Sequence, residues 1–348
     1  MSKASKVYII CVLFSLILLA CGNRENADNN RQISETATLP TPIGFQDLSS
    51  STATSGSTQK EATLATSSDV PLHAAFNTQG DISELIALGF NLFDIAGSKS
   101  NPEDTIARIN ALPEQTQALV WLGNLGNVPS GKACPPPGFS DAEFKAIVDA
   151  LANNPKVFGY NLADEPHPSK CPDAVDMLRV RSDYIHTIAP EQKVYITIQD
   201  GSNMCPEGEG CEYNALRPER THVDLIGIDP YPCHFNDMGK AVKCDTSKIS
   251  QRVQSAIDNG IPISAIVPIY QAFGQESRLD GKSTYYRMPT AQEFQDMYNI
   301  WKSLVPNPAF DFVYTWGIQC TESSCPAPQS LKNHPELQLL IKQYNSTP

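Results

Sequence analysis

Two adjacent carboxylates, Asp164 and Glu165, end the mostly apolar stretch 157–163 and are followed by Pro166. Burial of an ionised carboxyl is costly unless the group is paired or hydrogen-bonded, so a buried strand that ends in two acids favours a chemical task for them. Paired carboxyls act as general acid, general base or nucleophile, and cleavage of glycosidic bonds is one reaction that uses them. The alternative is an acidic turn that caps the next helix.

Other apolar stretches also end in side chains that are aromatic, amide or carboxylate. These are His73, Asn77, Asp94, Trp121, Asn124, Gln199, Asp200, Asp229, Tyr231, Tyr270, Gln271 and Trp316. The set contains no cationic clamp for a phosphate group and no clear nucleophilic Ser or Cys. Aromatic faces pack against the apolar faces of sugar rings, while amides and carboxylates hydrogen-bond sugar hydroxyls.

We therefore predict a polysaccharide or oligosaccharide substrate that is processed without a metal or an organic cofactor. The catalytic candidates are Glu165, Asp229 and Asp164, and the candidates for substrate binding are Gln271, Tyr231, Trp316, Tyr270, Asn124 and Asp94. For every one of them a structural role, in a turn, a cap or the core, is the competing interpretation.

Alternating strand and helix patterns must position these residues. Strand patterns cover 70–76, 91–97, 117–123, 157–165, 193–200, 222–232, 263–274 and 310–317. The sequences at 140–143 and 290–293 are capping boxes, 101–102 is an Asn-Pro helix start, and Asp81 is a predicted N-cap. The last helix is predicted over about 329–344.

Alternation of strands with helices predicts a parallel sheet, and eight repeats predict closure into a (β/α)8 TIM barrel that spans residues 70–348. In such a barrel the active site forms at the carboxyl ends of the strands. An open, doubly wound sheet is the alternative. No GxGxxG sequence follows the first strand, so nothing favours a dinucleotide site.

Four strand ends, YNLADEP, DLIGIDPYP, IVPIYQAFG and FVYTWG, together resemble those of clan A glycoside hydrolases. The resemblance covers about 70–345 and implies that Glu165, at the end of strand four, is the general acid/base. Asp164 replaces the Asn that usually precedes it. The clan's nucleophile, a Glu at the end of strand seven, is replaced here by Gln271, which cannot act as a carboxylate.

This departure leaves three interpretations open. A different carboxylate acts as nucleophile, with Asp229 the first candidate and Glu276 the second. Alternatively the enzyme inverts the anomeric centre, and Asp229 or Asp94 is the base that activates a water. In the third interpretation the barrel has lost catalysis and only binds glycans.

The N-terminal segment predicts export. Lys3 and Lys6 precede the apolar run 7–20, which has the length of a signal-peptide core. Its end, LLACG, resembles a bacterial lipobox, which implies a signal peptide over 1–20 and lipidation of Cys21, and hence a membrane anchor outside the cytoplasm. An ordinary secretory signal or a short membrane anchor is the alternative.

The segment 21–69 is rich in Ser, Thr, Asn and Gln and has no hydrophobic periodicity. Such a stretch buries too little apolar surface to offset its ordering entropy, so it is predicted to be a disordered tether.

Eight cysteines remain after the export segment, and an even number in an exported protein predicts disulfides. Short spacing favours the pairs Cys205–Cys211, Cys233–Cys244 and Cys320–Cys325, which leaves Cys134 with Cys171. No CxxC motif and no His pair at metal-ligand spacing is present.

The net charge of −12 argues against binding of nucleic acid or of anionic lipid surfaces. Removal of residues 1–20 takes away two lysines and no acid, which gives about −14. A neutral partner such as a sugar polymer suits this charge. The sequence carries no information on oligomeric state.

Overall fold

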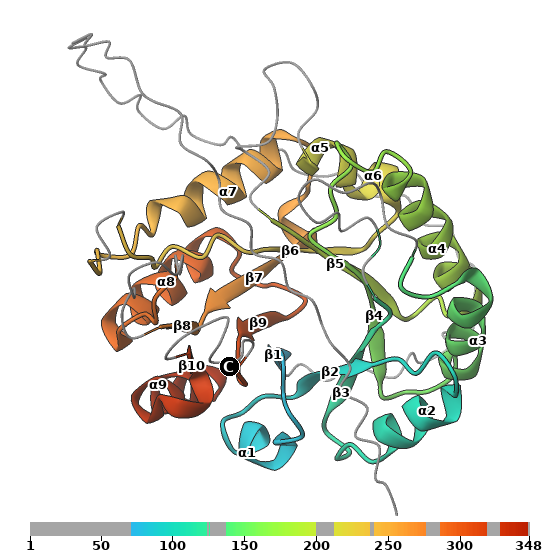
Figure 1. Cartoon of the computed structure of the whole chain (residues 1–348), viewed down its shortest axis with the longest axis horizontal. Coiled ribbons are helices and arrows are strands. Elements are labelled where there is room, and N and C mark those ends of the chain that lie inside the picture. Colours follow the sequence, from blue (N-terminus) through green and yellow to red (C-terminus); the bar gives the residue numbers. More distant parts are fainter. Residues whose placement is uncertain are drawn as a thin grey trace, which may run out of the picture. The chain divides into compact units, whose positions relative to one another are not determined.

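The computed structural model describes residues 71–123, 125, 137–199, 212–236, 240–275, 286–318 and 328–346. Eight strands form a closed barrel in the order β1-β2-β3-β4-β5-β6-β7-β9, with every neighbouring pair parallel (Figure 1). They are β1 His73–Ala75, β2 Leu92–Ala96, β3 Gln117–Trp121, β4 Val157–Asp164, β5 Lys193–Ile198, β6 Leu225–Ile228, β7 Ile266–Gln271 and β9 Asp311–Tyr314. All eight lie within the predicted stretches, and closure excludes the open doubly wound sheet.

Helices surround the barrel strands (Figure 1). The α-helices are α1 Ile82–Ala87, α2 Pro102–Asn110, α3 Asp141–Leu151, α4 Ala174–Ile188, α5 Glu212–Leu216, α6 Pro218–Thr221, α7 Ser247–Asp258, α8 Ala291–Leu304 and α9 Pro335–Asn345, with short 3-10 turns at Ile263–Ala265 and Leu331–Asn333. Both predicted capping boxes form, at Ser140 and at Thr290, and Asn101 caps α2 by accepting from the backbone of Glu103. None of the described helices is long and apolar enough to span a membrane.

Two helix starts differ from the prediction. The carboxylate of Asp81 makes no capping bond to α1, because it accepts from Trp316 Nε1 at 2.9 Å and pairs with Lys332. Residues 329–330, predicted to begin the last helix, belong instead to β10 (Pro328–Ser330). This strand pairs antiparallel with β8 (Phe273–Gln275), so α9 begins only at Pro335.

Two hydrophobic cores follow from strand alternation. The inner core fills the barrel with side chains from seven of its strands, among them Tyr195, Leu225 and Phe312. The outer core packs the other faces of the strands against the helices. Gly227 faces inward on β6, where an added Cβ would lie 2.1 Å from the Tyr195 hydroxyl, so a larger residue would displace that ring.

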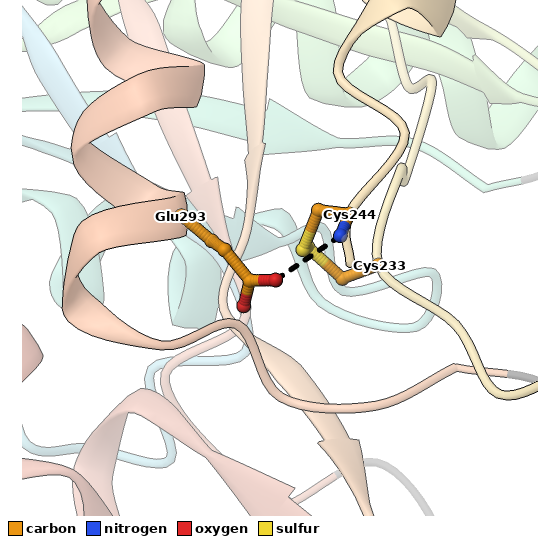
Figure 2. Close-up of side chains that lie close together, drawn as sticks. All are labelled: Cys233, Cys244 and Glu293. Atoms are coloured by element: carbon orange, nitrogen blue, oxygen red, sulfur yellow. Dashed lines mark hydrogen bonds between the residues drawn. A yellow bond between two sulfur atoms is a disulfide. The ribbon is translucent and has the colours of Figure 1, made fainter. Parts of the chain in front are cut away.

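A disulfide and a set of hydrogen bonds join the loop after β6 to α8. Cys233 and Cys244 form a disulfide, as predicted, and Glu293 accepts from the Cys244 backbone N–H at 3.0 Å (Figure 2). Arg287 binds both Glu293 oxygens, at 2.5 and 2.9 Å, and also donates to Val242 O. Burial alone would raise the pKa of Glu293, but Arg287 and the N–H donors outweigh burial and lower it to about 2.

The remaining predictions on cysteines and the N-terminus fall mostly beyond the described residues. Cys171 is disulfide-bonded. The positions not described are the export segment with Cys21, the tether 21–69, Asn124, Asp200, Glu276, Cys134, Cys205, Cys211, Cys320 and Cys325. Their predicted roles and pairings stay predictions.

Candidate functional site at the carboxyl ends of the barrel strands

An irregularity in β4 turns Asp164 toward the barrel axis. The ladder between β4 and β5 shifts register between Asn161 and Ala163. Leu162 and Ala163 both pack in the outer core, so the inward positions are 161 and 164 rather than 161 and 163. A β-bulge re-aims side chains in this way, and bulges are common next to active sites.

Glu165 and Asp229 meet at the same end of the barrel. Glu165 follows β4 with a left-handed φ of 51°, and its N–H donates to Thr197 O on β5 at 3.0 Å. Asp229 is the first residue after β6 and is 6% exposed. The two carboxyls are hydrogen-bonded to each other, which requires that at least one of them be protonated.

The electrostatics keep a proton on this pair. Burial raises the pKa of Glu165, and burial together with the charges of Glu165 and Asp164 raises the pKa of Asp229 well above its usual range. Burial and the charge of Glu165 raise the pKa of Asp164 to about 7. Burial and like charge therefore both favour the protonated form of at least one carboxyl of the pair.

Asp94 lies on β2, which is opposite β6 in the closed order of eight strands. Its Oδ2 accepts from the backbone N–H of Asn77 at 3.4 Å, and Asn77 has a left-handed φ of 57°. Burial raises the pKa of Asp94 to about 7, although backbone donors, including Asn77, favour its ionised form. This carboxyl is therefore poised between its two protonation states near neutral pH.

Aromatic rings lie beside the carboxyls. Tyr231, which has a φ of 34°, stacks on Tyr314 of β9 with ring centroids 5.8 Å apart, and both rings contact Phe273 edge-on. Burial and then the charge of Asp229 raise the pKa of Tyr231, while burial and the charges of the acidic residues raise that of Tyr314. Tyr231, a predicted binding residue, thus lies beside the carboxyls. Tyr314 lies there too and was not predicted.

Three buried oxygen acceptors at this end of the barrel have no hydrogen-bond partner among the described residues. They are Oδ1 of Asp94, Oδ1 of Asn161 and Oδ1 of Asp229, from β2, β4 and the end of β6. A buried acceptor without a donor costs about 1–3 kcal/mol, so each favours a ligand or water that brings O–H or N–H groups. Sequence reasoning did not single out Asn161.

A second buried pair, of which sequence reasoning missed Glu212, lies next to Glu165. His167 Nδ1 and Glu212 Oε1 are 2.8 Å apart, with side chains 9% and 3% exposed. Both act electrostatically on Glu165, since His167 lowers its pKa and Glu212 raises it. Glu212 follows His167 by 45 residues, so no local pattern links it to the end of β4.

Two aromatic residues predicted to bind substrate are core residues instead. Tyr270 faces outward from β7 and packs against Phe294 and Tyr298 of α8, at centroid distances of 5.7 and 6.0 Å. Trp316 is 1% exposed, and its indole N–H is bonded to Asp81. The strand ends at Tyr314, so Trp316 no longer follows its alternation.

Gln271 is also a structural residue. It is fully buried, and its Oε1 accepts from Cys233 N at 2.9 Å. Its Nε2 donates to the carbonyls of Cys233, Arg287 and Phe273 at 2.9, 3.0 and 3.3 Å. These hydrogen bonds join the loop after β6 to the loop after β7. The amide therefore binds backbone groups and is not available to a ligand.

His73, placed at a strand end by the sequence, begins β1 and lies at the opposite end of the barrel, where it pairs with Asp311 at 2.9 Å. One group of potential metal ligands occurs in the described ranges: Cys233, Cys244 and Glu293. The two sulfurs are bonded to each other, and a metal would need thiolates, so the disulfide occupies this group.

Comparison with known proteins gives information on the fold. No family model matches the sequence, and no curated protein sequence matches it. A beta-galactosidase from Bacillus circulans sp. alkalophilus has a TM-score of 0.53 at 8% identity, over 79% of this chain and 56% of that one. The spore cortex-lytic enzyme SleL of Bacillus cereus has a TM-score of 0.49 at 10% identity, over 80% and 75%. The chain therefore shares the (β/α)8 fold of the galactosidase.

The buried charge of Asp164 predicts a pH-dependent gain in stability on its removal. Folding raises the pKa of this carboxyl from 3.8 to about 7. Its contribution to stability is therefore fully present below pH 4 and is lost as the pH rises through 7. At pH 8 the free energy of unfolding of Asp164→Asn should therefore exceed that of the wild type, by at most about 4 kcal/mol, and its melting temperature should be higher. The difference should shrink toward pH 4 in calorimetry.

The exposed Asp149→Asn substitution is the matched control and should show no such trend. A melting difference for Asp164→Asn that is the same at pH 4 and pH 8 would contradict a raised pKa.

The bonds of Gln271 predict that Gln271→Glu is destabilising and does not restore a nucleophile. A carboxylate there would face three backbone carbonyls and lose every donor bond, at a cost of at least about 3 kcal/mol. Urea unfolding measures this loss, with the exposed Gln251→Glu as control. Unchanged stability together with a new hydrolytic activity would show that position 271 faces the substrate.

Proposed function

We propose that this protein is an exported glycoside hydrolase in which Glu165 is the general acid. The observation that carries the proposal is the hydrogen-bonded pair of Glu165 and Asp229, whose pKa values burial raises, beside the stacked rings of Tyr231 and Tyr314. Cleavage of a glycosidic bond needs a carboxylic acid that is still protonated at the working pH.

The other site residues suit a sugar. The faces of Tyr231 and Tyr314 offer apolar surface to a ring, and the unpartnered oxygens of Asp94, Asn161 and Asp229 need donors, which sugar hydroxyls supply. The shared fold with a beta-galactosidase supports this choice without specifying a substrate. The acceptor-rich lining and the net charge of −12 argue against a phosphorylated or otherwise anionic ligand.

In this mechanism the proton of Glu165 passes to the glycosidic oxygen as the bond to the anomeric carbon breaks. Positive charge develops on the sugar ring, and the ionised carboxyls nearby stabilise it. The hydrogen bond between the two carboxyls uses one proton, so its transfer to the glycosidic oxygen leaves Glu165 and Asp229 both ionised beside the positively charged ring. Water completes the reaction by adding its oxygen to the anomeric carbon.

A glycan-binding protein without turnover is the second candidate, and the observation in its favour is that Gln271 stands where clan A enzymes carry the nucleophile. Its amide weakens this argument, because it is fully buried and bonded to backbone groups. Hydrolysis separates the two candidates.

The test is hydrolysis of a panel of chitin oligosaccharides, β-1,3-glucan, β-1,4-glucan, xylan, mannan and galactan by the full-length protein in detergent. Glu165→Gln removes the acid while keeping the shape, and the rate should fall at least about a hundredfold. Asp149→Asn should leave it unchanged. If wild type and Glu165→Gln release no reducing sugar but bind one glycan equally, the protein is a binder and the proposed activity is wrong.

We also propose that the barrel is anchored outside the cytoplasm through lipid on Cys21, because the sequence before it is typical of a lipoprotein signal. Metabolic labelling with an alkyne fatty acid should mark the wild type and Cys11→Ser, and should not mark Cys21→Ser. An unlabelled wild type, or label retained in Cys21→Ser, would refute the anchor.

A further inference from the structure

The proposed reaction needs a second carboxyl on the other side of the sugar from Glu165. Retaining enzymes place it about 5–5.5 Å away as nucleophile, and inverting enzymes place it about 6.5–9.5 Å away as base for a water. Asp229 is in hydrogen-bond contact with Glu165, so it leaves no room for a sugar or a water between the two carboxyls. Gln271 supplies no carboxyl.

Asp94 is a carboxyl at this end of the barrel that is not part of the hydrogen-bonded pair. Its strand, β2, is two strands from β4 and lies across the barrel from β6. Its charge, like those of Asp164, Glu165 and Asp229, raises the pKa of Tyr314, so Asp94 belongs to the same end of the barrel.

Asp94 is nevertheless set apart from the hydrogen-bonded pair. Among the described residues, the one group of three His, Cys, Asp or Glu ligand atoms within 4.8 Å of one another excludes Asp94. Since Glu165 and Asp229 touch, Asp94 must lie more than 4.8 Å from at least one of them. As a base for a water, Asp94 would have to lie about 6.5–9.5 Å from Glu165.

The two oxygens of Asp94 have different surroundings. Oδ2 is fixed by the backbone N–H of Asn77, and Asn77 Nδ2 donates to Gly317 O at 3.2 Å, which ties the loop after β1 to that after β9. Oδ1 is buried and has no partner among the described residues. A carboxylate held by one oxygen and free at the other is arranged to orient and deprotonate a water.

We propose that Asp94 is the general base and that the enzyme inverts the anomeric centre. This inference rests on the proposed glycosidase function. The oxygen of a water bonds to the anomeric carbon while a water proton moves to Asp94 Oδ1. The bond from that carbon to the glycosidic oxygen breaks, and the departing oxygen takes the proton of Glu165. One water is consumed, and exchange with solvent moves the proton from Asp94 back to Glu165.

The protonation of Asp94 supports the same role. Burial holds its pKa at about 7, and a base is most effective when its pKa lies near the working pH. A carboxyl used only to hold a sugar hydroxyl needs no such tuning.

The experiment uses the full-length protein and whichever polysaccharide of the panel the wild type hydrolyses. Proton NMR of the first product should show the anomer opposite to that of the substrate. Asp94→Asn keeps shape and hydrogen-bonding ability, and kcat should fall at least about a hundredfold while KM changes little. Asp149→Asn is the control, and thermal melting verifies that each variant is folded.

A product with the retained anomer, or a folded Asp94→Asn variant that keeps more than about a tenth of kcat, overturns the role of Asp94. If Glu165→Gln is inactive in that case, the glycosidase proposal stands by itself. If the wild type hydrolyses nothing on the panel, the proposed function and this inference both fail.

Discussion

The site depends on one hydrogen bond between two buried acids, Glu165 and Asp229. An isolated ionised carboxyl is expensive to bury, and a pair of them is worse, so one proton must stay between the two groups. That proton is what makes the pair a candidate acid at neutral pH. The acids come from β4 and β6, which both pair in parallel with β5, so this strand order brings them to the same end of the barrel.

Backbone conformation and loop contacts position the residues around Glu165 and Asp229. Glu165, Tyr231 and Asn77 all have left-handed φ angles, of 51°, 34° and 57°, although none is glycine. Strained backbone persists only where the surroundings determine it, and it gathers at functional sites. Here each of the three residues follows a barrel strand. The hydrogen bonds of Gln271 and Arg287 and the Cys233–Cys244 disulfide hold the loops after β6 and β7 together.

The sequence predicted the strands and most helix starts because these depend on local patterns: alternation, apolar runs and capping residues. It failed where a side chain's direction depended on other segments. Neighbours such as Tyr270 and Gln271 cannot both face inward, and alternation alone does not say which one does. Alternation from Phe310 and Phe312 does point to Tyr314, a signal that was available.

Other features of the site were not readable from the sequence. The bulge that turns Asp164 inward leaves no residue signature in β4, since Leu162 and Ala163 suit a regular strand equally well. The pairing of His167 with Glu212 joins segments that only the fold brings together. Contact between the loops that follow the neighbouring strands β1 and β9 also decided that Asp81 bonds Trp316 instead of capping its own helix.

The most direct test of the account is the protonation state of Glu165 and Asp229. Carbon-13 NMR of protein with labelled Asp and Glu carboxyls, assigned with Glu165→Gln and Asp229→Asn, follows each group from pH 3 to pH 9. The account predicts that one proton remains on the pair at pH 7 and leaves only at higher pH. Two carboxyls that both ionise near pH 4, as in free Asp and Glu, would contradict it.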